Sequence, residues 1–157
     1  MRKDFFDYLY LLMETNKKIY IVFVGLGYPR YDEFKAKYPD RTINTEASEQ
    51  AALDIAVGLA RMDMIPFVYT ITPFYWRGAE TIRNYMSHEG YPVIMCGAGR
   101  GEDYTIDDGF THDAKDISQL MDLLKIKTCW PETKEEIPAL VEEMIREKKP
   151  YYLSLRR

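Results

Sequence analysis

Residues 44–61 read NTEASEQAALDIAVGLAR, which has the spacing of an amphipathic helix. At about 100° per residue, one polar stripe of this helix holds four side chains: Glu46, Gln50, Asp54 and Arg61. Glu49 lies outside the stripe, among the alanine and leucine side chains that face the core. An acid in the first turn complements the helix dipole, so a purely structural role is open. Fully buried glutamates are rare, however, and Glu49 therefore needs a partner or a chemical role.

Strand and helix patterns alternate along the rest of the chain. Runs of β-branched and aromatic residues predict strands at residues 18–25, 42–44, 66–71, 92–97, 127–130 and 151–155. Helical patterns occupy residues 1–18, 31–37, 77–87, 113–124 and 133–148. This alternation predicts an α/β fold: three layers, with a doubly wound, mostly parallel sheet covered by helices on both faces. Ligands bind such sheets outside the carboxyl ends of the strands.

Length and composition fit one soluble domain. A chain of 157 residues with 46% hydrophobic content buries one core and is short for two. The net charge of −4, without a large Lys/Arg cluster, argues against a nucleic-acid partner. No apolar run reaches the roughly 18 residues of a membrane span, and acids interrupt the apolar N-terminus. Cys96 and Cys129 lack zinc or redox spacing, which indicates buried thiols and a cytoplasmic protein.

Three motifs leave alternatives open or are disfavoured. Residues 25–27 (GLG) start like a dinucleotide-binding turn, but Arg30 stands where the third glycine belongs. The three aromatic residues in 72–76 (TPFYW) are compatible with packing in the core, with stacking on a planar ligand, or with a protein interface. Residues 107–116 contain acids and a histidine, which are possible metal ligands. A metal site would need at least one more close ligand, so we interpret this segment as a tight turn. We expect no metal ligands in this chain.

Taken together, these segments resemble the central, pyrimidine-binding domain of the transketolase family of thiamine diphosphate enzymes. The matching pieces, in order and with family-like spacing, lie at residues 38–60, 65–74, 77–83, 92–97, 108–117 and 148–157. The likeness covers essentially the whole chain. It therefore implies that residues 1–157 form a single pyrimidine-binding domain of transketolase type, with the diphosphate-binding and C-terminal domains absent.

The resemblance also implies a cofactor site. Glu49, in the EQ motif, is expected to be catalytic and to hydrogen-bond a ring nitrogen of the aminopyrimidine, which favours the imino form that removes the thiazolium proton. That role requires a carboxyl group that is protonated or shares a proton near neutrality, and apolar burial favours this state. Phe74 is expected to pack on the aminopyrimidine ring, with Ile71 or Tyr75 nearby.

The substrate site follows from the same likeness. Asp108 and His112 are expected to bind substrate hydroxyls and the carbonyl-derived oxygen, with His112 also catalytic. Arg157, or Arg156 if the register slips, resembles the terminal arginine that binds a sugar phosphate. Two departures leave donor and acceptor specificity open. The turn at residues 25–29 lacks the family's acidic residue, and Arg100 or Gly99 stands where an upstream histidine is usual.

The sequence contains no Gly-Asp-Gly motif followed some thirty residues later by Asn. We therefore expect the diphosphate and its Mg²⁺ to be held by a second polypeptide, with two copies of each chain, and Trp76 and Met86 to contribute to the interface. The expected function is transfer of a two-carbon ketol, or related acyl-anion, unit from a small sugar or keto-acid substrate to an aldehyde, by a subunit that is inactive alone. The alternatives are half of a 2-oxo acid decarboxylase or dehydrogenase, and a non-catalytic interaction domain that retains the fold.

Overall fold

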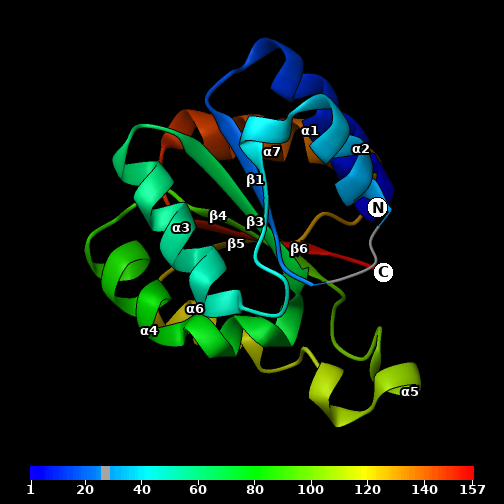
Figure 1. Ribbon diagram of the computed structural model, residues 1–157. Helices are drawn as coiled ribbons and strands as arrows, with labels where there is room; N and C mark the ends of the chain where they lie inside the picture. Colours follow the sequence, from blue (N-terminus) through cyan, green and yellow to red (C-terminus); the bar gives the residue numbers. More distant parts are fainter. Residues whose placement is uncertain (26–28) are drawn as a thin grey trace.

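The computed structural model describes residues 1–25 and 29–157, and within them a parallel sheet forms the middle layer (Figure 1). Its six strands are β1 (Ile19–Phe23), β2 (Thr42–Asn44), β3 (Ile65–Ile71), β4 (Ile94–Ala98), β5 (Lys127–Cys129) and β6 (Tyr151–Leu155). They lie in the order β2-β1-β3-β4-β6-β5, and every neighbouring pair is parallel. The predicted α/β fold with a parallel sheet is confirmed.

Helices cover both faces of the sheet. The α-helices are α1 (Arg2–Thr15), α2 (Arg30–Lys37), α3 (Glu49–Arg61), α4 (Ala79–Thr81), α5 (Thr105–Asp108), α6 (Ile117–Leu123) and α7 (Ile137–Glu147). The 3₁₀ segments are η1 (Pro39–Arg41), η2 (Thr72–Gly78), η4 (Phe110–His112) and η5 (Lys134–Glu136), and η3 (Ile82–His88) is a π-helix. Helices α1, α2 and α7 lie on one face, and α3, α4 and α6 lie on the other (Figure 1).

The two faces of the sheet are packed with different side chains. On the α1 face, aromatic rings dominate: the Phe6 ring lies 5.6 Å from that of Phe23 and 4.8 Å from that of Tyr69. On the α3 face, small residues such as Ala52 and Ala56 are fully buried and let the helix approach the sheet closely. Aromatic burial therefore anchors one layer, and close backbone approach anchors the other.

Two segments illustrate how local structure differs from the sequence expectation. The helix predicted at 44–61 begins at Glu49, because Asn44 ends β2 and Glu46 adopts a left-handed conformation with φ of 55° in the intervening turn. The segment predicted as a helix at 77–87 is α-helical only in part. It is preceded by the 3₁₀ segment η2, which starts at Thr72 with Pro73 in its first turn, and it continues as the π-helix η3.

Side-chain burial corrects one interface assignment. Met86 is fully buried in the core beneath α3, so its assignment to an exposed interface is wrong. The side chain of Trp76 is 46% exposed. None of the described helices has both the length and the apolar character that crossing a bilayer requires.

The sheet has a topological switch between β1 and β3. After β1 the chain passes to α2 on one face, whereas after β3 it passes through η2 to α4 on the other (Figure 1). The segments that leave the two adjacent carboxyl ends thus diverge, which opens a crevice at this edge of the sheet.

Two glycines are expected to respond in opposite directions to substitution by alanine. A Cβ on Gly97 would lie 2.6 Å from Thr72 Oγ1 and overlap the Tyr152 hydroxyl, so G97A lowers the free energy of unfolding by about 1–3 kcal/mol. Gly58, inside α3, has open space at its Cβ position, so G58A raises it by about 0.5–1 kcal/mol. Urea denaturation followed by circular dichroism measures both. A G97A protein as stable as the wild type would contradict this packing.

Candidate functional site

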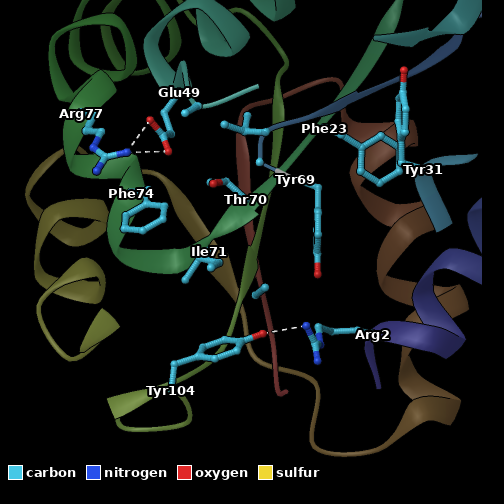
Figure 2. A pocket seen from close by; sticks show the side chains of 14 residues that line it. Arg2, Phe23, Tyr31, Glu49, Tyr69, Thr70, Ile71, Phe74, Arg77 and Tyr104 are labelled. Atoms are coloured by element: carbon cyan, nitrogen blue, oxygen red, sulfur yellow. Dashed lines mark hydrogen bonds and ion pairs between the residues drawn. The ribbon is translucent and has the colours of Figure 1, made fainter. Parts of the chain in front are cut away.

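A cavity of about 420 Å³ lies at the carboxyl ends of β1 and β3, where the topological switch opens the crevice (Figure 2). The strand ends and the segments that follow them contribute the lining: Phe23, Val24, Gly25, Ala47, Glu49, Tyr69, Thr70, Ile71, Phe74, Arg77 and Ala98. Arg2, Tyr31 and Tyr104 complete it. The size suits part of a small ligand, and the walls are mainly apolar with a few polar groups.

Glu49 is the first residue of α3, and its side chain is 4% exposed. The expected burial of this acid is confirmed. Its carboxylate accepts two hydrogen bonds from Arg77 Nη1, at 2.8 Å to Oε1 and 2.9 Å to Oε2 (Figure 2). The ion pair compensates the desolvation of the acid. Sequence reasoning identified the acid but missed this partner, because 28 positions separate the two residues and only the fold brings η2 to the start of α3.

Phe74 lies next to this ion pair on η2. The guanidinium carbon of Arg77 is 4.4 Å from the centroid of the Phe74 ring, within cation–π distance. Glu49, Phe74 and Arg77 therefore form one continuous wall of the cavity (Figure 2). Their spacing on η2 explains the arrangement, since Phe74 and Arg77 are three residues apart and a 3₁₀ turn places such residues on the same side.

Ile71 and Tyr75 flank this wall but lie in different surroundings. Ile71 lines the cavity at the end of β3. Tyr75 is fully buried and points into the core, where its hydroxyl donates to the carbonyl oxygens of Val68 at 2.8 Å and Cys96 at 3.1 Å. Burial raises the pKa of Tyr75 well above its ordinary value. Tyr75 thus anchors η2 to the sheet and does not line the cavity.

His112 reaches the site through Phe74. The two rings meet edge to face with centroids 5.2 Å apart, and His112 Nδ1 lies 3.0 Å from Thr111 Oγ1. Asp108 lies on α5 and is exposed, and its main-chain oxygen accepts a hydrogen bond from Thr111 Oγ1 at 3.3 Å. Within the described residues, no hydrogen bond joins the carboxylate of Asp108 to His112. The structure therefore brings His112, but not Asp108, to the Glu49 wall.

Arg2 and Tyr104 lie at the opposite side of the cavity (Figure 2), and a second arginine, Arg157, also contacts the Tyr104 ring. Arg2 Nη1 donates to the Tyr104 hydroxyl at 2.6 Å, and the guanidinium carbon of Arg157 lies 4.8 Å from the Tyr104 ring centroid. Arg156 instead approaches Asp103, with Nη1 3.8 Å from Oδ1. Sequence reasoning missed Arg2, because nothing in its position at the start of an amphipathic helix distinguishes it from a surface arginine.

The two departures from the family pattern have different outcomes. Arg100 is buried and bonded within the chain, since its guanidinium donates to Ser154 and to the carbonyl oxygen of Pro131, and it does not line the cavity. The middle of the 25–29 turn, residues 26–28, lies outside the described residues. Among the residues that the structure does describe, no three acidic, histidine or cysteine side chains come together as metal ligands.

Known proteins are similar to this chain over most of its length. The family model for the transketolase pyrimidine binding domain matches residues 8–157. The chain belongs to this family. A 1-deoxy-D-xylulose-5-phosphate synthase of Clostridium botulinum (strain Eklund 17B / Type B) is 28% identical over 119 residues, covering 75% of this chain and 19% of that protein. The 6-deoxy-6-sulfo-D-fructose transketolase subunit SqwH of Clostridium sp. (strain MSTE9) is 24% identical over 125 residues, covering 79% of this chain and 39% of that protein.

Solved structures give the same picture. A split gene transketolase, described as an inactive beta4 tetramer, superposes with a TM-score of 0.86 at 25% identity, covering 99% of this chain and 50% of that one. Transketolase from Leishmania mexicana superposes with a TM-score of 0.85 at 18% identity, covering 99% of this chain and 25% of that one, which supports the fold alone. The chain therefore spans half or less of the length of each of these proteins.

The ion pair of Glu49 and Arg77 is expected to contribute to stability. R77A leaves the buried carboxylate without its charged partner and lowers the free energy of unfolding by about 1–2 kcal/mol. E49Q is nearly isosteric. The loss of unfolding free energy in the double variant E49Q/R77A is expected to be smaller than the sum of the two single losses by about 0.5–1.5 kcal/mol. Urea denaturation of the four proteins measures the coupling. Strict additivity would show that the two side chains do not interact.

Proposed function

We propose that this chain is the pyrimidine-binding subunit of a transketolase-like thiamine diphosphate enzyme, and that residues 1–157 supply one domain of it. The enzyme transfers a two-carbon ketol, or related acyl-anion, unit to an aldehyde acceptor. The observation that carries the proposal is the placement of the buried Glu49 carboxyl group and the Phe74 ring on one cavity at the topological switch of the sheet, in a chain of this family.

The residues of the cavity fit the aminopyrimidine end of the cofactor. A planar ring needs an aromatic or aliphatic face to pack on and a hydrogen-bonding group at its edge, and Phe74, Ile71 and Glu49 offer these along one cavity. When bound, thiamine diphosphate supplies acyl-anion chemistry. Glu49 then holds or shares a proton at a ring nitrogen, while Phe74 and Ile71 orient the ring and exclude water from its face.

Substrate recognition is assigned to the loops around the cavity. His112 lies against the edge of Phe74, and because Thr111 contacts Nδ1, we assign Nε2 to the substrate oxygen. Asp108 is assigned to substrate hydroxyls, which requires α5 to approach the site in the assembled enzyme. Arg157 is assigned to an anionic group of the substrate, and Arg2 joins it because both guanidinium groups contact Tyr104.

The remainder of the cofactor site is assigned to a second polypeptide. One structural neighbour is a split gene transketolase, and SqwH is named as a transketolase subunit, so division of this enzyme between chains has precedent. We propose that the partner chain holds the diphosphate and Mg²⁺, that two copies of each chain assemble, and that this chain is inactive alone. Trp76, half-exposed on η2, is a candidate for the interface between them.

Conversion of Glu49 to glutamine tests the cofactor assignment. In the complex purified with its native partner, E49Q is expected to lower turnover by at least about 10²-fold, because the amide cannot hold the proton at the ring nitrogen. E80Q serves as the control: Glu80 is exposed on α4 and does not line the cavity. Steady-state kinetics of both variants give the comparison. Turnover of E49Q within a few-fold of wild type would exclude the proposed role.

A second experiment tests the reaction class and the need for a partner. The assembled complex, supplied with thiamine diphosphate and Mg²⁺, is expected to cleave a ketose phosphate donor when an aldehyde acceptor is present, and the isolated chain is expected to show no turnover. Product formation is followed by mass spectrometry, with pyruvate as the competing donor. Decarboxylation of pyruvate without ketose cleavage would contradict ketol transfer and assign the enzyme to the 2-oxo acid decarboxylases or dehydrogenases. Activity of the isolated chain would contradict the proposed need for a partner chain.

A further inference from the structure

Arg77 makes the two contacts that the proposed function assigns to the aminopyrimidine ring. Its Nη1 donates to both oxygens of Glu49, at 2.8 Å and 2.9 Å, and its guanidinium carbon lies 4.4 Å from the centroid of the Phe74 ring. One planar, nitrogen-bearing group therefore contacts the acid at its edge and the aromatic ring at its face (Figure 2). An aminopyrimidine can make both contacts, because it is also planar, packs on aromatic rings and can share one proton between its ring nitrogen and the Glu49 carboxyl group.

We propose that Arg77 occupies the place of the aminopyrimidine in the chain without cofactor, and that the incoming ring displaces it from Glu49 and Phe74. This inference rests on the proposed function and adds a competing occupant to the same site. Arg77 is thereby a residue that sets how tightly the cofactor binds. It is neither a ligand of the diphosphate nor a participant in proton transfer.

The surroundings of the ion pair permit the exchange. Glu49 is 4% exposed and is the first residue of α3, whereas the side chain of Arg77 is 56% exposed at the rim of the cavity. The arginine can therefore move into solvent while the acid stays in place. An ion pair with one half-exposed partner is weak, since water competes for the guanidinium. When the ring binds, one proton taken up from solvent lies between its ring nitrogen and the Glu49 carboxyl group, so the buried acid remains satisfied.

The exchange has a cost for cofactor binding. When a site is available only in a fraction of molecules, the apparent dissociation constant equals the intrinsic constant divided by that fraction. If Arg77 closes the site in about 70–90% of molecules, its removal tightens binding by about 3- to 10-fold. A lysine at this position keeps the charge but lacks the planar guanidinium that covers Phe74, so R77K is expected to fall between wild type and R77A.

The test measures thiamine diphosphate binding, in the presence of Mg²⁺, to the complex of this chain with its co-purified partner. Isothermal titration of wild type, R77A and R77K is expected to show binding about 3- to 10-fold tighter for R77A. The control is R83A, because Arg83 is exposed, contacts the Asn84 side chain and lies outside the cavity lining. R83A is expected to bind as the wild type does. Folding of each variant is checked by circular dichroism, and R77K replaces R77A if the latter does not assemble.

A second readout follows Arg77 itself. Side-chain ¹⁵N NMR of the wild-type complex is expected to show the Arg77 guanidinium signal shift toward solvent values as thiamine diphosphate saturates the site. Equal or weaker binding by R77A and R77K, or an Arg77 signal that does not change, would overturn the inference while leaving the proposed function intact. Absence of cofactor binding to every complex, wild type included, would instead overturn the proposed function and this inference with it.

Discussion

The parallel pairing of β1 with β3 is the constraint on which the site depends. The register joins Ile19 to Ile65 at one end and Phe23 to Tyr69 at the other, so both carboxyl ends meet at one edge. Because β1 continues to one face of the sheet and β3 to the other, the helices α2 and α4 that follow them lie on opposite faces (Figure 1). The cavity, the start of α3 and the η2 segment all lie around this point, and none of them could be brought together by local sequence alone.

Burial of a carboxylate imposes the second condition. Small side chains along α3 let the helix lie close to β3, and this approach brings Glu49 into an apolar wall at the helix N-terminus. Desolvation of the acid requires compensation, which in the free chain comes from Arg77 and in the proposed complex from a ring nitrogen. The same packing that stabilises the sheet therefore creates the demand for a hydrogen-bonding partner at this position.

The site is divided between well-packed and loosely held parts. Phe74 and Ile71 are held by the end of β3 and by Tyr75, whose hydroxyl bonds two strands through their main-chain oxygens. Asp108, by contrast, lies on the four-residue helix α5 and is exposed. The side of the cavity proposed to hold the cofactor is thus preorganised by the sheet, whereas the residue proposed to bind substrate hydroxyls lies on an exposed connecting segment.

The sequence by itself determined the alternation of strands and helices, the parallel α/β class and the burial of Glu49, because hydrophobic periodicity directly reports which side chains leave water. Only the tertiary structure decided that Tyr75 points into the core, that Met86 is covered, and that Arg2 and Arg77 line the cavity. An arginine has the same local pattern on a surface as in a site. Its role depends on which distant segment the sheet order places beside it, and for Arg77 that segment is 28 residues away.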